Sequence, residues 1–142
     1  CIARGLKSYG KLITLEINDE FASISKKYFM EAGLESSIQL INGDANVIIP
    51  TLENGIDLVF MDAEKEQYSE YFDLVFPKLK KGGFILADNT LWDGKVAFEE
   101  EFKDPASVAL RSFNKKILEN SSVENLILPL RDGISIIRKI KD

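Results

Sequence analysis

Acidic and amide side chains follow four apolar runs of this 142-residue chain, and together these side chains could bind a cation. Glu16 ends the first run, Asp44 follows the second, Asp62 follows the third, and Asp88 and Asn89 follow the fourth. A single acid after a strand is usually a helix cap or a solvated loop residue. Several acids on one edge raise the free energy unless a cation or hydrogen-bond donors neutralise them. The pattern therefore predicts a cation site, provided that the four runs are strands of one sheet.

The kind of metal follows from the residues that are missing. The sequence contains no histidine, which is the commonest general base and a frequent metal ligand. An ion would be held by oxygen atoms, which favours magnesium, calcium or manganese over zinc. Asp62, Asp88 and Asn89, with waters completing an octahedron, would suit magnesium. A turn-forming Asx pair is the alternative interpretation of Asp88 and Asn89, and composition alone leaves the two evenly balanced.

Two further residues have a functional interpretation beside a structural one. Lys65 lies three residues beyond Asp62, close enough to share its pocket. A solvated lysine is the alternative, but a positive charge is poorly placed at the start of a helix, which favours a role in chemistry. An acid at the end of the second strand of a nucleotide-binding sheet commonly accepts hydrogen bonds from ribose hydroxyls. Glu16 would be this acid if one strand precedes the run 11–16.

Alternating strands and helices are expected to carry these residues. The periodicity predicts strands over residues 11–16, 37–41, 56–61, 84–87, 123–130 and 133–140, and helices over 2–9, 19–32, 45–52, 66–79 and 105–120. Asp19 is expected to cap the second helix, the nearly continuous apolar run 56–61 to be buried on both faces, and residues 88–104 to form a loop. Arg131-Asp132-Gly133 predicts a hairpin turn.

These elements predict an α/β fold, namely a Rossmann-like, doubly wound, mostly parallel sheet with helices on both faces and an antiparallel C-terminal hairpin strand. Ligands of such sheets bind beyond the carboxyl ends of the strands, which is where the acidic residues are expected. The length fits a single domain over residues 1–142.

Charge and composition narrow the partners and the compartment. The formal charge of −5, from 18 basic and 23 acidic residues, argues against nucleic-acid binding as the main purpose. No apolar run reaches the roughly 20 residues that cross a bilayer. One cysteine cannot form an internal disulfide, so a cytoplasmic location is expected.

Five segments, LITLEIND, INGDA, LVFMDAEKEQY, KGGFILADNTLWDGKV and LPLRDGISIIRK, together resemble the caffeoyl-CoA and catechol O-methyltransferase family, especially its bacterial members. The resemblance covers residues 11–139. It implies a class I methyltransferase fold and O-methylation of a vicinal-hydroxyl, catechol-like small aromatic molecule. The methyl donor would be S-adenosylmethionine, with the help of Mg²⁺ or another divalent cation such as Ca²⁺ or Mn²⁺. Relatives are commonly dimeric, so a homodimer is expected.

The resemblance also implies a role for individual residues. Cofactor binding would fall to Glu16 at the ribose, to Asp44 and Ala45 at the adenine, and to Glu64, which stands where the family often has Asp. The metal ligands would be Asp62, Asp88 and Asn89. Lys65 would be the catalytic lysine, which accepts the phenol proton if burial lowers its pKa, or stabilises the phenolate. Trp92 and Asp93 would face the acceptor, with a buried core tryptophan as the alternative for Trp92.

One departure from the family lies at the start of the chain. Family members have a first strand and a glycine-rich turn, preceded by further helices, immediately before the helix predicted over residues 2–9. The chain is therefore expected to be an N-terminally incomplete member that lacks the central strand of the sheet. By itself it is expected to bind the cofactor poorly and to be inactive.

Other functions remain open at this point. A transfer-RNA hydroxyuridine O-methyltransferase has similar motifs, and retention on RNA that weakens with salt would favour it. A non-catalytic, Rossmann-like nucleotide-binding module predicts no metal dependence and no effect of changing Lys65. A purely structural role ranks last, because the clustered acidic side chains would then destabilise the fold without serving a function. Dehydrogenase chemistry also ranks low, because the diagnostic glycine fingerprint is absent from the sequence.

Overall fold

The structure, a computed structural model, describes residues 1–141 of the chain. The chain divides into two compact units, Cys1–Thr51 and Leu52–Asp142, which are described one at a time. Among residues 1–141, no helix is both long enough and apolar enough to cross a membrane.

The first unit contains two parallel strands and the helix that connects them. Strand β1 (Leu12–Glu16) pairs with β2 (Ile38–Asn42), and α1 (Asp19–Glu31) joins them. The remaining elements are short: the 3-10 helices η1 (Ile2–Gly5) and η2 (Ile49–Thr51), and α2 (Ala45–Ile48). Asn18, and not Asp19 as predicted, caps α1, because the Asn18 side chain accepts hydrogen bonds from the backbone N–H groups of Glu20 and Phe21.

The second unit contains a four-stranded sheet in the order β3-β4-β6-β5. Its strands are β3 (Ile56–Met61), β4 (Leu79–Asp88), β5 (Val123–Leu128) and β6 (Ile134–Lys139). Its helices are η3 (Lys65–Gln67), α3 (Tyr68–Val75), η4 (Phe76–Lys78), η5 (Trp92–Ala97) and α4 (Pro105–Glu119). Strands β3 and β4 are parallel, whereas β6 runs antiparallel to both of its neighbours. The predicted closing hairpin is thus confirmed.

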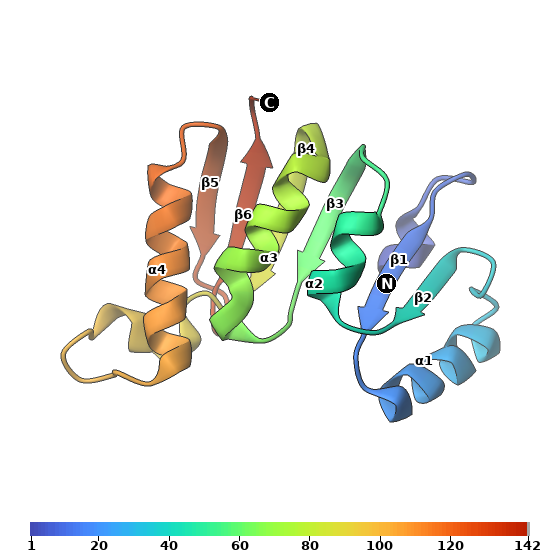
Figure 1. Cartoon of the computed structure of the whole chain (residues 1–142), viewed down its shortest axis with the longest axis horizontal. Helices are drawn as coiled ribbons and strands as arrows, with labels where there is room; N and C mark the ends of the chain where they lie inside the picture. The colour runs from blue at the N-terminus through green and yellow to red at the C-terminus, as the bar shows by residue number, and fades with distance from the viewer. Residues whose placement is uncertain (142) are drawn as a thin grey trace. The chain divides into compact units, whose positions relative to one another are not determined.

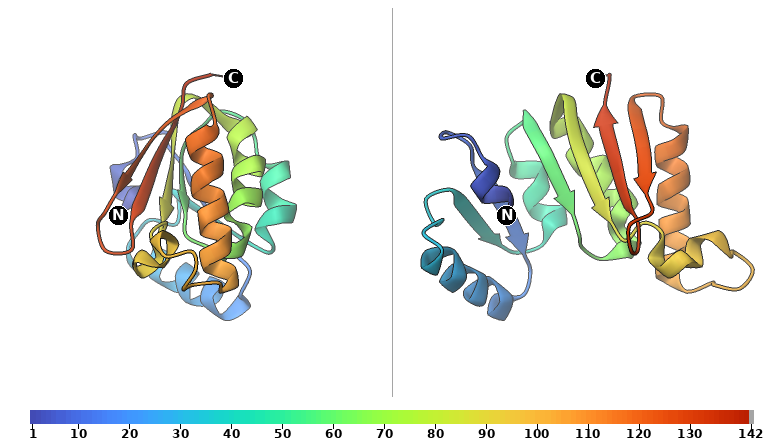
Figure 2. Two further views of the ribbon diagram at one scale, coloured as in Figure 1. Left: turned by 90° about the vertical axis from the view of Figure 1, so that its left-hand side faces the viewer. Right: turned by 180° about the vertical axis from the view of Figure 1, so that it is seen from behind.

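Helices α3 and α4 lie on the same side of this sheet (Figures 1 and 2). Between them and the sheet is a core whose members are at most 3% exposed: Tyr68, Phe72, Leu79, Ile85, Leu110, Phe113, Ile117 and Ile137. On the opposite face, Leu58, Phe60 and Phe84 are 38–48% exposed. The prediction that residues 56–61 are buried on both faces is therefore wrong, because the long helices of this unit cover only one face.

Local boundaries also differ from those predicted between residues 75 and 104. Helix α3 ends at Val75 and not at residue 79, and Pro77, which has no N–H to donate, follows within the short helix η4. Strand β4 then begins at Leu79, five residues earlier than predicted, with an irregular segment in which Gly82 has a φ of 84°. The expected loop after β4 contains the short helix η5.

The hairpin turn between β5 and β6 packs against the segment that leaves β4. The backbone N–H of Thr90 donates to the carbonyl of Gly133 at 3.1 Å, and that of Leu91 donates to the carbonyl of Asp132 at 2.7 Å. Gly133 has a φ of 82°, and a Cβ atom there would lie 2.4 Å from Leu91 Cγ. Only glycine fits this position, so the turn fixes the backbone immediately beyond Asp88 and Asn89.

Candidate functional site

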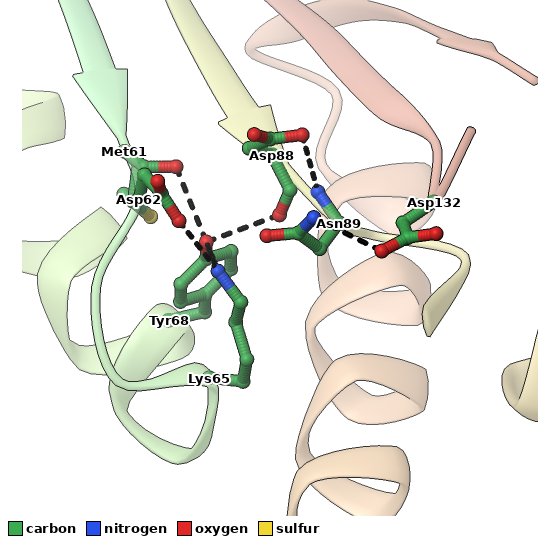
Figure 3. Close-up of polar contacts among 7 residues, drawn as sticks. All are labelled: Met61, Asp62, Lys65, Tyr68, Asp88, Asn89 and Asp132. Carbon is green, nitrogen blue, oxygen red and sulfur yellow. Dashed lines mark hydrogen bonds and ion pairs between the residues drawn. The ribbon is translucent and has the colours of Figure 1, made fainter. Parts of the chain in front are cut away.

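Two carboxylates come from neighbouring positions at the ends of β3 and β4. Met61 pairs with Ala87 in the parallel ladder, so Asp62 and Asp88, one residue further on, lie beside each other. Neighbouring strands are about 4.8 Å apart, which is close enough for two such side chains to share one ligand. Asn89 follows directly, and Figure 3 shows these three residues with Lys65, Tyr68 and Asp132 around them. The ladder therefore explains why residues 26 positions apart in sequence lie together.

Lys65 extends from η3 back to the end of β3. Its Nζ donates hydrogen bonds to Asp62 Oδ1 at 2.9 Å and to the Tyr68 hydroxyl at 2.7 Å. Only 10% of its side chain is exposed, against 53% for Asp62. Burial alone lowers the pKa of Lys65, but the hydrogen bonds and charges of Tyr68 and Asp62 outweigh burial, so the net pKa is raised. This direction is opposite to the lowering that proton acceptance by Lys65 requires.

Tyr68, the first residue of α3, lies at the centre of the site and is fully buried. Its hydroxyl is 3.2 Å from the carbonyl oxygen of Met61 and 3.0 Å from that of Asp88. Burial, the largest cause, raises the pKa of Tyr68. Tyr68 falls within the helix predicted over residues 66–79, and it was not predicted to be a site residue. The one signal that could have identified it is the spacing of three residues from Asp62 to Lys65 and again from Lys65 to Tyr68.

Asn89 has an unusual backbone and an oriented amide. Its φ of 58° lies in the left-handed region, which Asn tolerates better than most residues. Its backbone N–H donates to Asp88 Oδ1 at 2.8 Å, and its Nδ2 donates to Asp132 Oδ2 at 3.4 Å. Because the amide nitrogen faces Asp132, the amide oxygen faces away from Asp132 (Figure 3). Asp132 was predicted only as a turn residue, and no local signal links it to Asn89.

The chemistry of this group fits a hard divalent cation. Asp62 and Asp88 each use one carboxylate oxygen in the hydrogen bonds described above, and a carboxylate has a second oxygen with further lone pairs. With the amide oxygen of Asn89 they form a set of oxygen donors of the kind that magnesium and calcium prefer. Among residues 1–141 no three His, Cys, Asp or Glu side chains are grouped as metal ligands. An ion here would thus depend on the amide and on ligands from outside the chain.

The remaining predicted residues of the second unit lie on either side of this group. Trp92 is half-buried at the start of η5, so it is not a core tryptophan, and Lys95 Nζ lies 5.8 Å from the centroid of its ring. Asp93 is exposed, and both Trp92 and Asp93 have positive φ values, 48° and 53°. Glu64 is exposed just before η3 and makes no capping hydrogen bond with its side chain.

Three predicted cofactor residues belong to the first unit. Glu16 is half-buried at the end of β1, where its Oε1 accepts a hydrogen bond from the backbone N–H of Asn18 at 2.8 Å. Asp44 is exposed and caps α2 by accepting from the backbone N–H of Asn46 at 2.8 Å, and Ala45 is the first residue of that helix. Both carboxylates therefore also have local structural roles.

This α/β unit gathers oxygen donors and a lysine at the carboxyl ends of parallel strands, which is the edge where open α/β sheets bind their ligands. The family model described as O-methyltransferase matches residues 1–140. The chain therefore belongs to the O-methyltransferase family, and the predicted family is confirmed.

Individual relatives agree with this assignment. The chain is 38% identical to a catechol O-methyltransferase of Niastella koreensis, over 91% of this chain and 60% of the relative. It is 35% identical to a probable caffeoyl-CoA O-methyltransferase of Dictyostelium discoideum, over 92% of this chain and 59% of the relative. The chain thus spans about three fifths of the length of these relatives.

Solved structures confirm the predicted fold class. An O-methyltransferase from Streptomyces achromogenes involved in tomaymycin synthesis, solved in complex with SAM, matches with a TM-score of 0.92 and 26% identity. The match covers 99% of this chain and 66% of that one. An O-methyltransferase from Bacillus cereus in complex with SAH matches with a TM-score of 0.91 and 25% identity, over 97% and 66% of the two chains.

Proposed function

We propose that this chain is part of an S-adenosylmethionine-dependent O-methyltransferase that methylates a vicinal-hydroxyl, catechol-like small molecule with the help of a divalent cation. The observation that carries the proposal is the meeting of Asp62, Asp88 and Asn89 at the ends of β3 and β4, with Lys65 beside Asp62. Membership of the O-methyltransferase family and relatives named for catechol and caffeoyl-CoA substrates support the choice of reaction.

The reaction needs a nucleophilic oxygen behind the methyl group. A methyl–oxygen bond forms as the methyl–sulfur bond breaks, S-adenosylhomocysteine leaves, and the proton of the acceptor hydroxyl passes to Lys65 or to solvent. S-adenosylmethionine supplies the activated methyl group as a sulfonium. When bound, a divalent cation would supply Lewis-acid chemistry that makes an acceptor hydroxyl more acidic. Asp62, Asp88 and Asn89 would hold this ion, and Mg²⁺ suits their oxygen atoms best, with Ca²⁺ or Mn²⁺ as substitutes.

Lys65 would act on the acceptor oxygen as that oxygen loses its proton. The lysine ammonium is held by Asp62 and Tyr68 and is largely removed from solvent, so its direction is fixed before an acceptor binds. A fixed charge in a site of low dielectric stabilises a developing phenolate more strongly than a solvated one does. Acceptance of the proton by Lys65 is the other possible role, and the variants described below separate the two.

The other predicted residues complete the proposal. In the first unit, Glu16 is proposed to bind the ribose hydroxyls, and Asp44 and Ala45 the adenine. In the second unit, Glu64 is proposed to contact the cofactor. Trp92, half-buried and next to the loop that carries Asn89, is proposed to form a wall of the acceptor site, with the exposed Asp93 beside it.

The direct test is methylation of 3,4-dihydroxybenzoate by the intact protein in EDTA and after addition of magnesium, calcium or manganese. We expect the rate to fall in EDTA and to recover with a divalent ion. Full activity in EDTA would rule out the cation. Methylation of transfer RNA without any methylation of the catechol would show that the acceptor is RNA and not a small molecule.

Variants of Lys65 test the lysine. We expect Lys65→Ala to lower kcat by about a hundredfold or more, as for the loss of other catalytic side chains. Lys65→Arg keeps the positive charge but cannot accept a proton, so retained activity in this variant would favour phenolate stabilisation. Lys80→Ala is the matched control, because Lys80 forms an exposed ion pair with Asp57 in the same unit. Equal rates for Lys65→Ala and Lys80→Ala would remove Lys65 from the mechanism.

A further inference from the structure

We propose that Tyr68 is the positioning residue of this site, because its hydroxyl holds the Lys65 ammonium against the ends of β3 and β4. The inference rests on the proposed function, since it assumes that Lys65 takes part in methyl transfer. Tyr68 itself is not proposed to touch the methyl donor or the acceptor.

The hydrogen-bonding capacity of one hydroxyl sets the arrangement. Lys65 Nζ has no acceptor capacity, so in the 2.7 Å contact Lys65 donates and the Tyr68 oxygen accepts. The single proton of Tyr68 is then directed to the carbonyl of Asp88 at 3.0 Å or to that of Met61 at 3.2 Å. The hydroxyl thereby connects the lysine to the last residue of one of the two strands, next to the three candidate metal ligands.

Packing alone does not explain a tyrosine at this position. The ring of Tyr68 packs edge-on against Phe113, with 5.5 Å between the ring centroids, and phenylalanine would make the same contact. Its hydroxyl is buried with the rest of the side chain, and a buried hydroxyl without a hydrogen-bond partner is unfavourable. The three polar neighbours of the hydroxyl are therefore the reason why a tyrosine fits here.

Asp62 alone would hold Lys65 less firmly. More than half of the Asp62 side chain is exposed, and Asp62 is also a candidate metal ligand. Tyr68 lies on the buried side of the ammonium, which is also 4.8 Å from the centroid of the Tyr68 ring. The buried hydroxyl is thus the partner of Lys65 that remains in place when Asp62 has another ligand.

The first experiment detects the Lys65 ammonium directly. Lysine ammonium groups give a proton–nitrogen correlation signal by NMR only when their protons exchange slowly with water, as in a buried hydrogen bond. Buried Lys139, whose Nζ donates to the Leu79 carbonyl at 2.9 Å, should also give such a signal. We expect one signal of the intact protein to be lost in Lys65→Arg, which assigns that signal to Lys65. In Tyr68→Phe this signal should be lost or exchange at least about tenfold faster, as expected for one lost hydrogen bond to a charged group. An unchanged signal would overturn the inference, whether or not the protein methylates a catechol.

The second experiment is a double-mutant cycle in kcat with 3,4-dihydroxybenzoate, magnesium and saturating S-adenosylmethionine. Tyr68→Phe should lower kcat about tenfold while KM for the catechol stays within about twofold. In a Lys65→Met background, Tyr68→Phe should lower kcat almost no further, because Tyr68 is proposed to act only by holding the Lys65 ammonium. A merely structural role would give the same factor in both backgrounds and would overturn the inference.

A stability control separates positioning from a general loss of packing. Ile117, which is 3% exposed in the same core, can be shortened to valine without touching Lys65 or Tyr68. Ile117→Val should lower the melting temperature but leave kcat and the lysine signal unchanged. If Ile117→Val lowers kcat as much as Tyr68→Phe does, the effect of Tyr68 is structural. If the intact protein methylates no catechol but its lysine signal responds to Tyr68→Phe, the proposed function fails and the positioning contact stands.

Discussion

The two units of this chain differ in what holds their elements in place. In the first unit, large apolar side chains on and around α1 and β1 remain exposed, among them Ile13, Phe21, Ile24, Tyr28 and Met30. The described elements of this unit are set mainly by local signals such as the Asn18 and Asp44 caps and the parallel ladder. In the second unit, α3 and α4 enclose a core with the sheet.

Side-chain positions are more strongly determined in the second unit than in the first. In the second unit, Tyr68 belongs both to the core and to the polar site, so the packing of α3 also fixes the contacts of Lys65. In the first unit, Glu16 and Asp44 contact backbone N–H groups of the next turn and are set by their own surroundings. Matched substitutions in the two units can therefore test this difference.

The largest effect is expected for a core phenylalanine. Phe113→Ala, at a fully buried position, should lower the free energy of unfolding of the second unit by about 4 kcal/mol. Phe21→Ala, at a position 58% exposed in the first unit, should change the free energy of unfolding of the first unit by less than about 0.5 kcal/mol. Urea titration followed by the fluorescence of Trp92, the single tryptophan, reports on the second unit, and urea titration followed by circular dichroism reports on both units. Equal losses in the two variants would show that Phe21 is packed as tightly as Phe113, which would contradict the difference between the two units.

A smaller effect is expected for glycines with positive φ. Gly133→Ala forces a Cβ atom against Leu91 in addition to a left-handed backbone, so we expect a loss of about 3 kcal/mol. Gly33→Ala, where φ is 64° and nothing lies within 4 Å, should lose only the backbone part, about 1 kcal/mol. Thermal unfolding followed by circular dichroism measures both. Similar losses would mean that the turn at Gly133 does not pack on the β4 exit as described.

The smallest effect concerns the helix caps and pH. Ser107 donates to Asp104 from its hydroxyl at 2.6 Å and from its backbone N–H at 3.0 Å, and these bonds, the hydroxyl first, hold the pKa of Asp104 below its ordinary value. The stabilisation is then fully present above the ordinary pKa of about 4 and is lost as the pH falls through the lower, folded-state pKa. Asn18, which caps α1, does not titrate.

Melting temperatures of wild type and Asp104→Asn between pH 7 and pH 2.5 check this prediction. The wild type should be slightly more stable at neutral pH, and the difference should shrink in acid. A difference that is constant across this range would show that the Asp104 charge does not stabilise α4.

Much of the fold could be predicted because its signals are local. The strand 56–61, the helix start at Pro105 and the hairpin at Asp132 and Gly133 each follow from a few neighbouring residues, and the structure has them at those positions. The start of β4 could not be predicted, because the pairing of Leu79 with Ile56 depends on a partner strand and on an irregular backbone around Gly82. Exposure of Phe60 also depends on which face the distant helices cover.

Some residues of the candidate site could be predicted from local sequence signals, and others could not. The positions of Asp62, Asp88 and Asn89 after their strands are readable from the sequence, and parallel pairing brings the two strand ends together. Tyr68 and Asp132 were missed, because their partners are the carbonyl of Asp88, 20 residues away, and the amide of Asn89, 43 residues away. An apolar periodicity predicts that a tyrosine is buried but contains no information on where its hydroxyl points.

Binding of manganese to the intact protein tests whether Asp62, Asp88 and Asn89 hold a divalent cation. Free Mn²⁺ gives a six-line electron paramagnetic resonance signal that disappears on binding, so a titration counts the bound ions. We expect one ion per chain that competes with magnesium, with affinity lowered at least about tenfold in Asp62→Asn and in Asp88→Asn and unchanged in Asp57→Asn, at the exposed ion pair with Lys80. Equal affinity in wild type and Asp88→Asn, or no bound ion at all, would contradict the account.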